Sequence, residues 1–186
     1  SRLLAPFFGT SLFVWANLIG LILLYLTIGY YVGGRLADRQ PHPAIFYIVA
    51  IVAAALIGLI PVISHPILNW SLFTFATFPP GIFYGSLASV ILLFALPMIL
   101  LGCVSPFAIR LSVERVDKSG RTAGRLYATS TAGSIAGTFL PVLWLIPTYG
   151  TNATFFITAA TLLLFSLFGL LATRLSTSDR SPGSSQ

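Results

Sequence analysis

Residues 128–138 read ATSTAGSIAGT, and this stretch is the strongest single guide to the fold. It lies in an uncharged run from Leu126 to Thr148, long enough to cross a bilayer at about 20 residues per helical crossing. Ile135 is its only bulky residue, whereas small residues let helix backbones approach closely and here occupy most of the circumference. We therefore expect an enclosed helix at the centre of a membrane bundle. A seam of small residues between two chains is the alternative. The residues expected to make close contacts are Gly124, Ala128, Thr131, Ala132, Gly133, Ala136 and Gly137.

The composition is that of a membrane protein. Hydrophobic residues make up 56% of the chain, charged residues 8%, and the mean hydropathy is +0.94, whereas a soluble domain carries about 25% charged residues. A chain with a bilayer as solvent must satisfy its backbone within helices or a closed barrel. Its apolar runs are long and do not alternate, which predicts an all-α polytopic bundle.

Five apolar runs are expected to span the membrane within a helical domain at residues 1–175. Pro97 is expected to kink the third run. A Ser-rich tail at 176–186 is expected to be disordered and cytoplasmic. The predicted spans are 11–32, 44–63, 82–104, 126–148 and 153–173.

Charged residues alternate between connections. All except Arg2 follow the first, third or fifth run, and the connections 64–81 and 149–152 carry none. The positive-inside rule then places the charged connections and the C-terminus in the cytoplasm, in the cell (inner) membrane. The net charge of +6 therefore does not indicate nucleic acid. Arg2 and the odd number of spans together predict a further helix ending near Leu4, in an ancestral six-span unit.

The outer segment Pro66–Pro80 is aromatic and uncharged, and at 15 residues it is too short to span comfortably. It is expected to lie in the interface, either as part of an aromatic belt or as a docking surface for a partner subunit or lipid. On the other face, 105–125 is expected to be a surface helix or a helix extension, with basic residues that attract anionic headgroups. The outer residues proposed as a partner or lipid surface are Trp70, Phe73, Phe75 and Phe78.

Residues that carry chemistry are scarce. Asn17 is expected to make an interhelical hydrogen bond, and His42 and His65 are expected at opposite membrane faces as surface residues. The single cysteine, Cys103, allows no internal disulfide and no CxxC site. We expect no catalytic residue, no metal and no cofactor. The hydroxyls of the small-residue stretch either pack between helices or line a polar path; they belong to Thr129, Ser130, Thr131, Ser134 and Thr138.

The loop motif at 34–39 reads GRLADR, with Gly34, Arg35, Asp38 and Arg39 as its functional residues. At a cytoplasmic helix end, Asp38 can face the positive N-terminus of another helix while the arginines pair with acidic groups or carbonyls. The motif then acts as a clamp in a static bundle or as a latch in a mobile one.

The motif resembles the loop signature of major facilitator superfamily transporters. The longer pattern is similar to the membrane region of multi-span spermidine-synthase-like proteins. It includes RLLAPFFGTS at 2–11, the helix ending at 33–39, GRLYA at 124–128 and LIPTYG at 145–150. Leu101-Gly102, Ser105-Pro106 and Arg110 also fit this pattern. The second transporter half and the soluble aminopropyltransferase domain have no counterpart, so the resemblance implies architecture and carries no catalytic residue.

Three functions follow from these observations. The first is a non-catalytic membrane subunit that anchors or scaffolds protein partners in a larger complex. The second is a transport module for small solutes, with polyamines as one candidate, working as a homodimer with a cavity lined by Asn17 and the hydroxyl residues. The third is the membrane part of a split aminopropyltransferase-like system.

Overall fold

The computed structural model describes residues 2–8, 12–75, 81–112 and 119–178, and every regular element in these ranges is helical. Four helical stretches are long and apolar enough to cross a membrane, so the expected class, a helical membrane protein, is confirmed. These stretches are Leu12–Arg39, Pro43–Thr74, Phe83–Ser112 and Ala123–Leu175. The elements are α1 (Ala5–Phe8), α2 (Leu12–Arg39), α3 (Pro43–Phe75), α4 (Gly81–Ser112), α5 (Ser119–Leu140), the π-helical η2 (Pro141–Leu145) and α6 (Ile146–Ser178).

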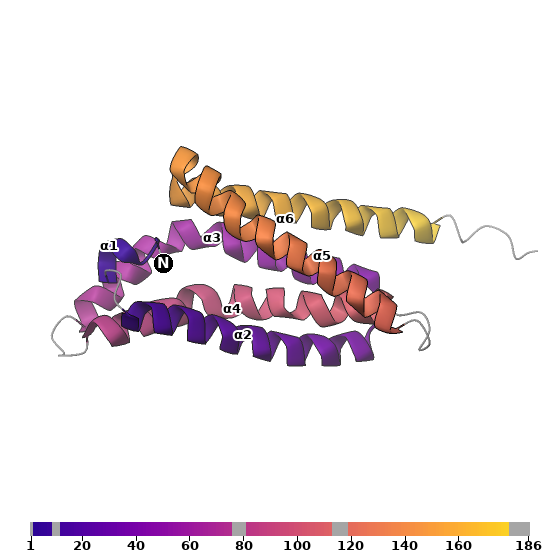
Figure 1. The fold of residues 1–186 in the computed structure, drawn as a ribbon, viewed down its shortest axis with the longest axis horizontal. Coiled ribbons are helices and arrows are strands. Elements are labelled where there is room, and N and C mark those ends of the chain that lie inside the picture. The colour runs from indigo at the N-terminus through magenta and orange to yellow at the C-terminus, as the bar shows by residue number, and fades with distance from the viewer. Residues whose placement is uncertain (1, 9–11, 76–80, 113–118, 179–186) are drawn as a thin grey trace, which may run out of the picture.

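The last of the four stretches folds back on itself. Its 53 residues would be about 80 Å long as one straight helix, against about 30 Å of hydrocarbon in a bilayer. The chain leaves helical geometry at Gly150, whose φ of 83° is readily adopted only by glycine. Figure 1 shows α5 and α6 as the two arms of a hairpin that meet near this residue. The π-helical turn begins at Pro141, which has no N–H to continue the α-helical pattern.

Helices α2 and α4 run parallel in close contact. A Cβ atom added to Gly33 would lie 2.8 Å from the Cβ of Cys103, and one added to Gly102 would lie 2.9 Å from the Cα of Gly29. Real Cβ atoms essentially never approach so closely, so these positions require glycine unless the helices separate. The spacing Gly29-xxx-Gly33 is the small-residue pattern that lets membrane helices pack backbone to backbone.

Helix α3 packs on the other side of α4 and also packs against α6. Between α3 and α6, a Cβ atom added to Gly58 would lie 3.3 Å from Ala159. A buried hydrophobic cluster joins the N-terminal segment and α1–α4, with Leu4, Val14 and Phe94 among its members, and Phe155 of α6 packs against it. Figure 1 shows α2, α3, α4 and α6 lying roughly along one axis, with α5 crossing them obliquely.

The expectation that 128–138 is enclosed by the chain's own helices is wrong. Every residue from Tyr127 to Leu140 is exposed, and Ile135 is 56% exposed. The positions of Gly124, Gly133 and Gly137 have nothing within 4 Å of an added Cβ. The physical reason is that the chain uses other small residues, those of α2, α3, α4 and α6, for its close contacts, and α5 makes little contact with the other long helices.

Several predicted helix boundaries also differ from the structure. The second span was expected to end at Ile63, but α3 continues through Pro61 and Pro66 to Phe75. Buried Ile60 and Leu68 pack in the core cluster on both sides of these prolines, and such packing allows proline inside a membrane helix. Helix α4 likewise extends to Ser112, so the first part of 105–125 is a helix extension. Helix α6 continues to Ser178, and the rest of the predicted tail lies outside the described residues.

Candidate functional site

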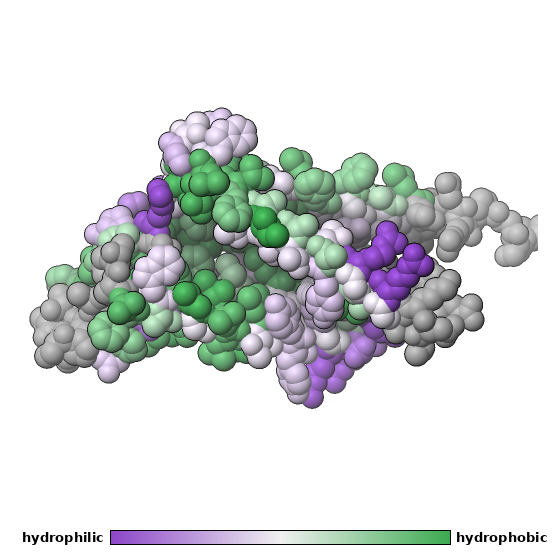
Figure 2. All heavy atoms as spheres, viewed as in Figure 1, coloured by the Kyte–Doolittle hydropathy of each residue, from purple (hydrophilic) through white to green (hydrophobic). Residues whose placement is uncertain are grey.

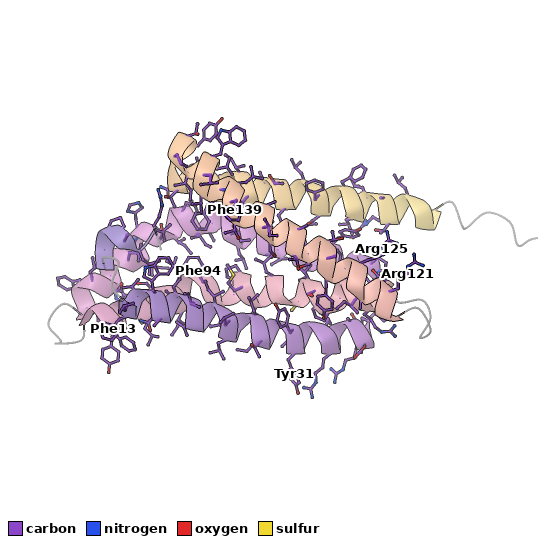
Figure 3. All side chains as sticks on the ribbon, in the orientation of Figure 1. Phe13, Tyr31, Phe94, Arg121, Arg125 and Phe139 are labelled. Atoms are coloured by element: carbon purple, nitrogen blue, oxygen red, sulfur yellow. The ribbon has the colours of Figure 1, made fainter. Side chains whose placement is uncertain are left out.

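The charged side chains gather at the end of the molecule where α2 and α4 finish and α5 begins. Figure 2 shows this end as hydrophilic and the middle of the same face as largely hydrophobic, and Figure 3 labels Arg121 and Arg125 there. The Nε of Arg110 lies 3.3 Å from the Oδ1 of Asp38, which joins the ends of α4 and α2. Arg35 stacks over the ring of Tyr31 with its guanidinium carbon 4.3 Å from the ring centroid.

The GRLADR motif is helical. The first predicted span ends at residue 32, just before Gly33, but α2 continues to Arg39, so the motif forms its last turns. Gly33 is required by its contact with Cys103 and does not interrupt the helix. Asp38 meets the side chain of Arg110 near the C-terminal end of α4, whereas the N-terminus of another helix was expected. Both side chains are solvent-exposed, at 74% and 49%, so this is a surface ion pair.

Buried hydrogen bonds connect the three core helices. The amide nitrogen of Asn17 donates to the carbonyl of Phe83 at 3.0 Å and to the hydroxyl of Ser86 at 2.8 Å, which confirms the expected interhelical bond. The hydroxyls of Ser71 and Ser89 lie 2.8 Å apart between α3 and α4. These serines are fully buried, and the sequence analysis missed them because isolated serines in apolar runs give no periodic signal.

A cleft of about 500 Å³ separates α5 from α2 and α4. Thr129, Ser130 and Ser134 line it from α5, and the residues opposite them on α2 and α4 are mostly apolar, with Tyr30 and Ser105 as the polar exceptions. The predicted polar cavity therefore exists in part. Asn17 does not line this cleft, because its side chain is bonded between α2 and α4.

A second cavity of about 280 Å³ lies between α3, α4 and α6. Its lining is almost entirely apolar, with Phe46, Tyr47 and Phe165 among the contributors. Leu101 and Val104 border both this cavity and the cleft, so the two spaces flank the same part of α4.

The structure describes part of the predicted outer aromatic surface. Residues 66–75 are the last turns of α3, where Trp70 is 54% and Phe73 88% exposed. Leu68 and Ser71 on the opposite side are buried against α4. The side chain of Phe75 and all of Phe78 lie outside what the structure describes.

The described residues include no group of three or more His, Cys, Asp or Glu side chains close enough to share a metal ion. His42 and His65 are both exposed. No protein-family model, no curated protein and no solved structure matches this chain. The fold and composition define the class, a helical membrane protein.

Proposed function

We propose that this chain is a non-catalytic integral membrane subunit, a transporter-like helical module that anchors or scaffolds a partner protein within a larger complex. The observation that carries the proposal is the exposed surface of α5. Its large aliphatic and aromatic residues are few, and Thr129, Gly133 and Ala136 are among the small residues that it exposes. The exposed side of α2 carries the opposite kind of surface, with Leu12, Phe13, Trp15, Ile19, Leu23 and Leu24.

This difference matters because the two surfaces suit different neighbours. Large aliphatic side chains fill the space beside lipid tails, whereas small residues allow another helix to approach and form close van der Waals contacts. A surface of Gly, Ala, Ser and Thr that is exposed in one chain therefore suits a second protein helix. Gly133 and Gly137 repeat the spacing that Gly29 and Gly33 use inside the chain.

The charge at the end of α5 narrows the class of partner. Arg121 and Arg125 lie one turn apart and are exposed. Two copies of this chain inserted in the same direction would bring these like charges together across a shared α5 seam. We therefore favour a different protein, whose transmembrane helix has small residues along one side and Asp or Glu at the same membrane surface.

The topology of the proposed subunit has five crossings, with α5 and α6 as separate spans. The charged end, which includes Arg39, Arg110 and Arg121, faces the cytoplasm by the positive-inside rule, and the C-terminus lies on that side of the inner membrane. The resemblance to the membrane region of multi-span spermidine-synthase-like proteins belongs to the same proposal. Its support is that two residues of the resembling pattern, Asp38 and Arg110, pair with each other.

A site-specific crosslinking experiment tests this function. A photo-crosslinking amino acid replaces Ala136 on α5, and in a matched control it replaces Gly20, an exposed α2 residue with nothing within 4 Å of an added Cβ. After extraction in mild detergent, we expect a stoichiometric adduct only from Ala136, and peptide mapping should place it in a transmembrane helix of another protein. An adduct containing a second copy of this chain, or none from Ala136, would overturn the proposal.

Substitution gives an independent measurement. Gly133→Leu fills the exposed small surface, and Gly20→Leu makes the same change on the side of α2 that carries large residues. We expect the partner to be lost from the purified complex only with Gly133→Leu. Phe73→Asp, tested in parallel, determines whether the outer aromatic surface also contributes. Retention of the partner by Gly133→Leu would argue against docking on α5.

The cleft supports a second candidate function, a small-solute transport module. Three hydroxyl residues of α5 line a space of about 500 Å³, which lies within the range of small-molecule sites at about 300–1,000 Å³. Transport of a polyamine or another small solute into proteoliposomes, lost with Ser130→Leu, would favour it. Proteoliposomes that carry the purified chain and move no tested solute would leave the scaffold as the better account.

A further inference from the structure

A cavity of about 450 Å³ lies at the end of the molecule opposite the charged end. It is formed where the N-terminal segment, the middle of α3 and the turn at Gly150 meet. Figure 2 shows hydrophilic atoms beside the turn between η2 and α6, close to α1, on a face that is otherwise largely hydrophobic. The residues that give it polar character are Arg2, Ser64, His65, Tyr149, Thr151 and Asn152.

Arg2 gives this cavity a positive charge that the described chain does not neutralise. Among the described residues the only side-chain carboxylate is Asp38, which pairs with Arg110 at the far end of α2. Arginine stays protonated under all physiological conditions and binds phosphate and carboxylate groups through several donors. The charge beside the cavity is therefore suited to an anionic group that the protein itself does not supply.

Further donors come from the other two walls. His65 lies on α3, its ring 6.0 Å from that of Phe7, and Thr151 and Asn152 follow the break at Gly150. The helix restarts after this break, so its first backbone N–H groups have no acceptor within their own helix. Such groups favour an anion, and here they are on the same cavity as an arginine.

The rest of the lining is apolar. Leu3, Pro6, Phe7 and Leu68 border the cavity, and Leu68 belongs to the buried core cluster. A free inorganic anion would leave this apolar surface uncovered. A ligand with a charged head and a hydrocarbon body would use both kinds of wall.

We infer that this cavity binds the phosphate group of an anionic amphiphile, with the phosphate at Arg2 and the hydrocarbon against Leu3, Phe7 and Leu68. The ligand class is a phospholipid with net negative charge, taken from the leaflet at this end of the molecule. The site is independent of the proposed docking on α5, because none of its lining residues belongs to that helix.

Photo-labelling tests the inference. The purified complex in neutral detergent is incubated with phosphatidylglycerol that carries a diazirine on its acyl chain, and labelled peptides are mapped. We expect labelling within 3–7 and 64–68, where the hydrocarbon lies, and an apparent affinity about tenfold weaker for Arg2→Gln, the effect of losing one charged hydrogen-bond donor. Arg39→Gln removes the same charge at the opposite end and should leave labelling of these peptides unchanged.

Two further measurements distinguish an anionic phospholipid from other sources of phosphate. Diazirine-bearing phosphatidylcholine should label these peptides weakly, because its phosphate is neutralised within the headgroup. Inorganic phosphate in excess should not displace phosphatidylglycerol. Equal labelling by the two lipids, unchanged affinity of Arg2→Gln, or displacement by inorganic phosphate would each overturn the inference. Cys103 protection from alkylation, measured in each variant, confirms that the fold is retained.

Discussion

Replacing Gly29 by alanine tests the backbone contact between α2 and α4. The new Cβ would lie 2.8 Å from the Cα of Gly102 and closer still to the backbone oxygen of Ile99. Carbon atoms need about 3.5–4 Å, so the two helices would have to separate by about 1 Å. Neither obstacle is a flexible side chain, and overpacking of this kind costs up to about 3 kcal/mol. Alanine regains about 1 kcal/mol of helix propensity, which leaves a net destabilisation of about 2 kcal/mol.

The matched control should have the opposite effect on stability. Gly20 is in the same helix and has nothing within 4 Å of an added Cβ, so Gly20→Ala should stabilise α2 by up to about 1 kcal/mol. The two variants introduce the same methyl group into the same helix. Their opposite effects would therefore come from the contact with α4 and from no general property of alanine.

The single cysteine provides the assay. Cys103 is 3% exposed, packs against Gly33 in this contact, and becomes accessible to a thiol reagent when the helices part. A loss of about 2 kcal/mol raises the open population, and hence the alkylation rate, by about 30-fold. We expect this increase for Gly29→Ala and an unchanged or slower rate for Gly20→Ala. Equal rates in the two variants would refute the close contact between α2 and α4.

Two further predictions concern polar contacts. Asn17→Leu removes the bonds to the carbonyl of Phe83 and the hydroxyl of Ser86, and should destabilise the chain by about 0.6–1.7 kcal/mol, as interhelical bonds in membranes do. The measurement is again the rate of Cys103 alkylation, which Asn17→Leu should raise. Thr27→Val removes an exposed hydroxyl bonded within its own helix and should change this rate little. For the exposed pair at the charged end, a double-mutant cycle of Asp38→Asn and Arg110→Gln should give a coupling below about 1 kcal/mol that weakens with salt. A larger, salt-independent coupling would contradict the description of this pair as an exposed surface ion pair.

The sequence was sufficient for the class of fold. Long apolar runs without alternation and charges confined to alternate connections are enough to predict a helical membrane protein, and Asn17 stood out as a polar residue that needs a partner. The break before the last helix was also predictable, because Gly150 follows two prolines of the preceding run. The helix ends were less accurate, since packing on α4 carries α3 through Pro61 and Pro66.

The location of the close contacts could not be predicted in the same way. The sequence predicted a first span that ends just before Gly33 and a packed centre formed by the small residues of 128–138. In the structure, Gly33 lies in the close contact between α2 and α4, and Gly133 lies on an exposed surface. The small residues of a helix indicate that another helix can approach it closely. They do not indicate which helix does so. The cavity at Arg2 was missed for a related reason, because residues far apart in sequence form its walls.

Glycine therefore has two roles in this chain: it allows close contact between two of the chain's own helices, and it forms part of an exposed surface. Substitution can separate these two roles. Gly29 is in contact with backbone of the same chain, so its replacement should raise Cys103 alkylation whether or not a partner is bound. A Cβ atom added to Gly133 would meet no described residue within 4 Å, so Gly133→Leu should leave alkylation unchanged in the isolated chain while the partner is lost. If Gly133→Leu instead raised Cys103 alkylation in the isolated chain, α5 would belong to the intramolecular core, and the original expectation of an enclosed helix would be restored.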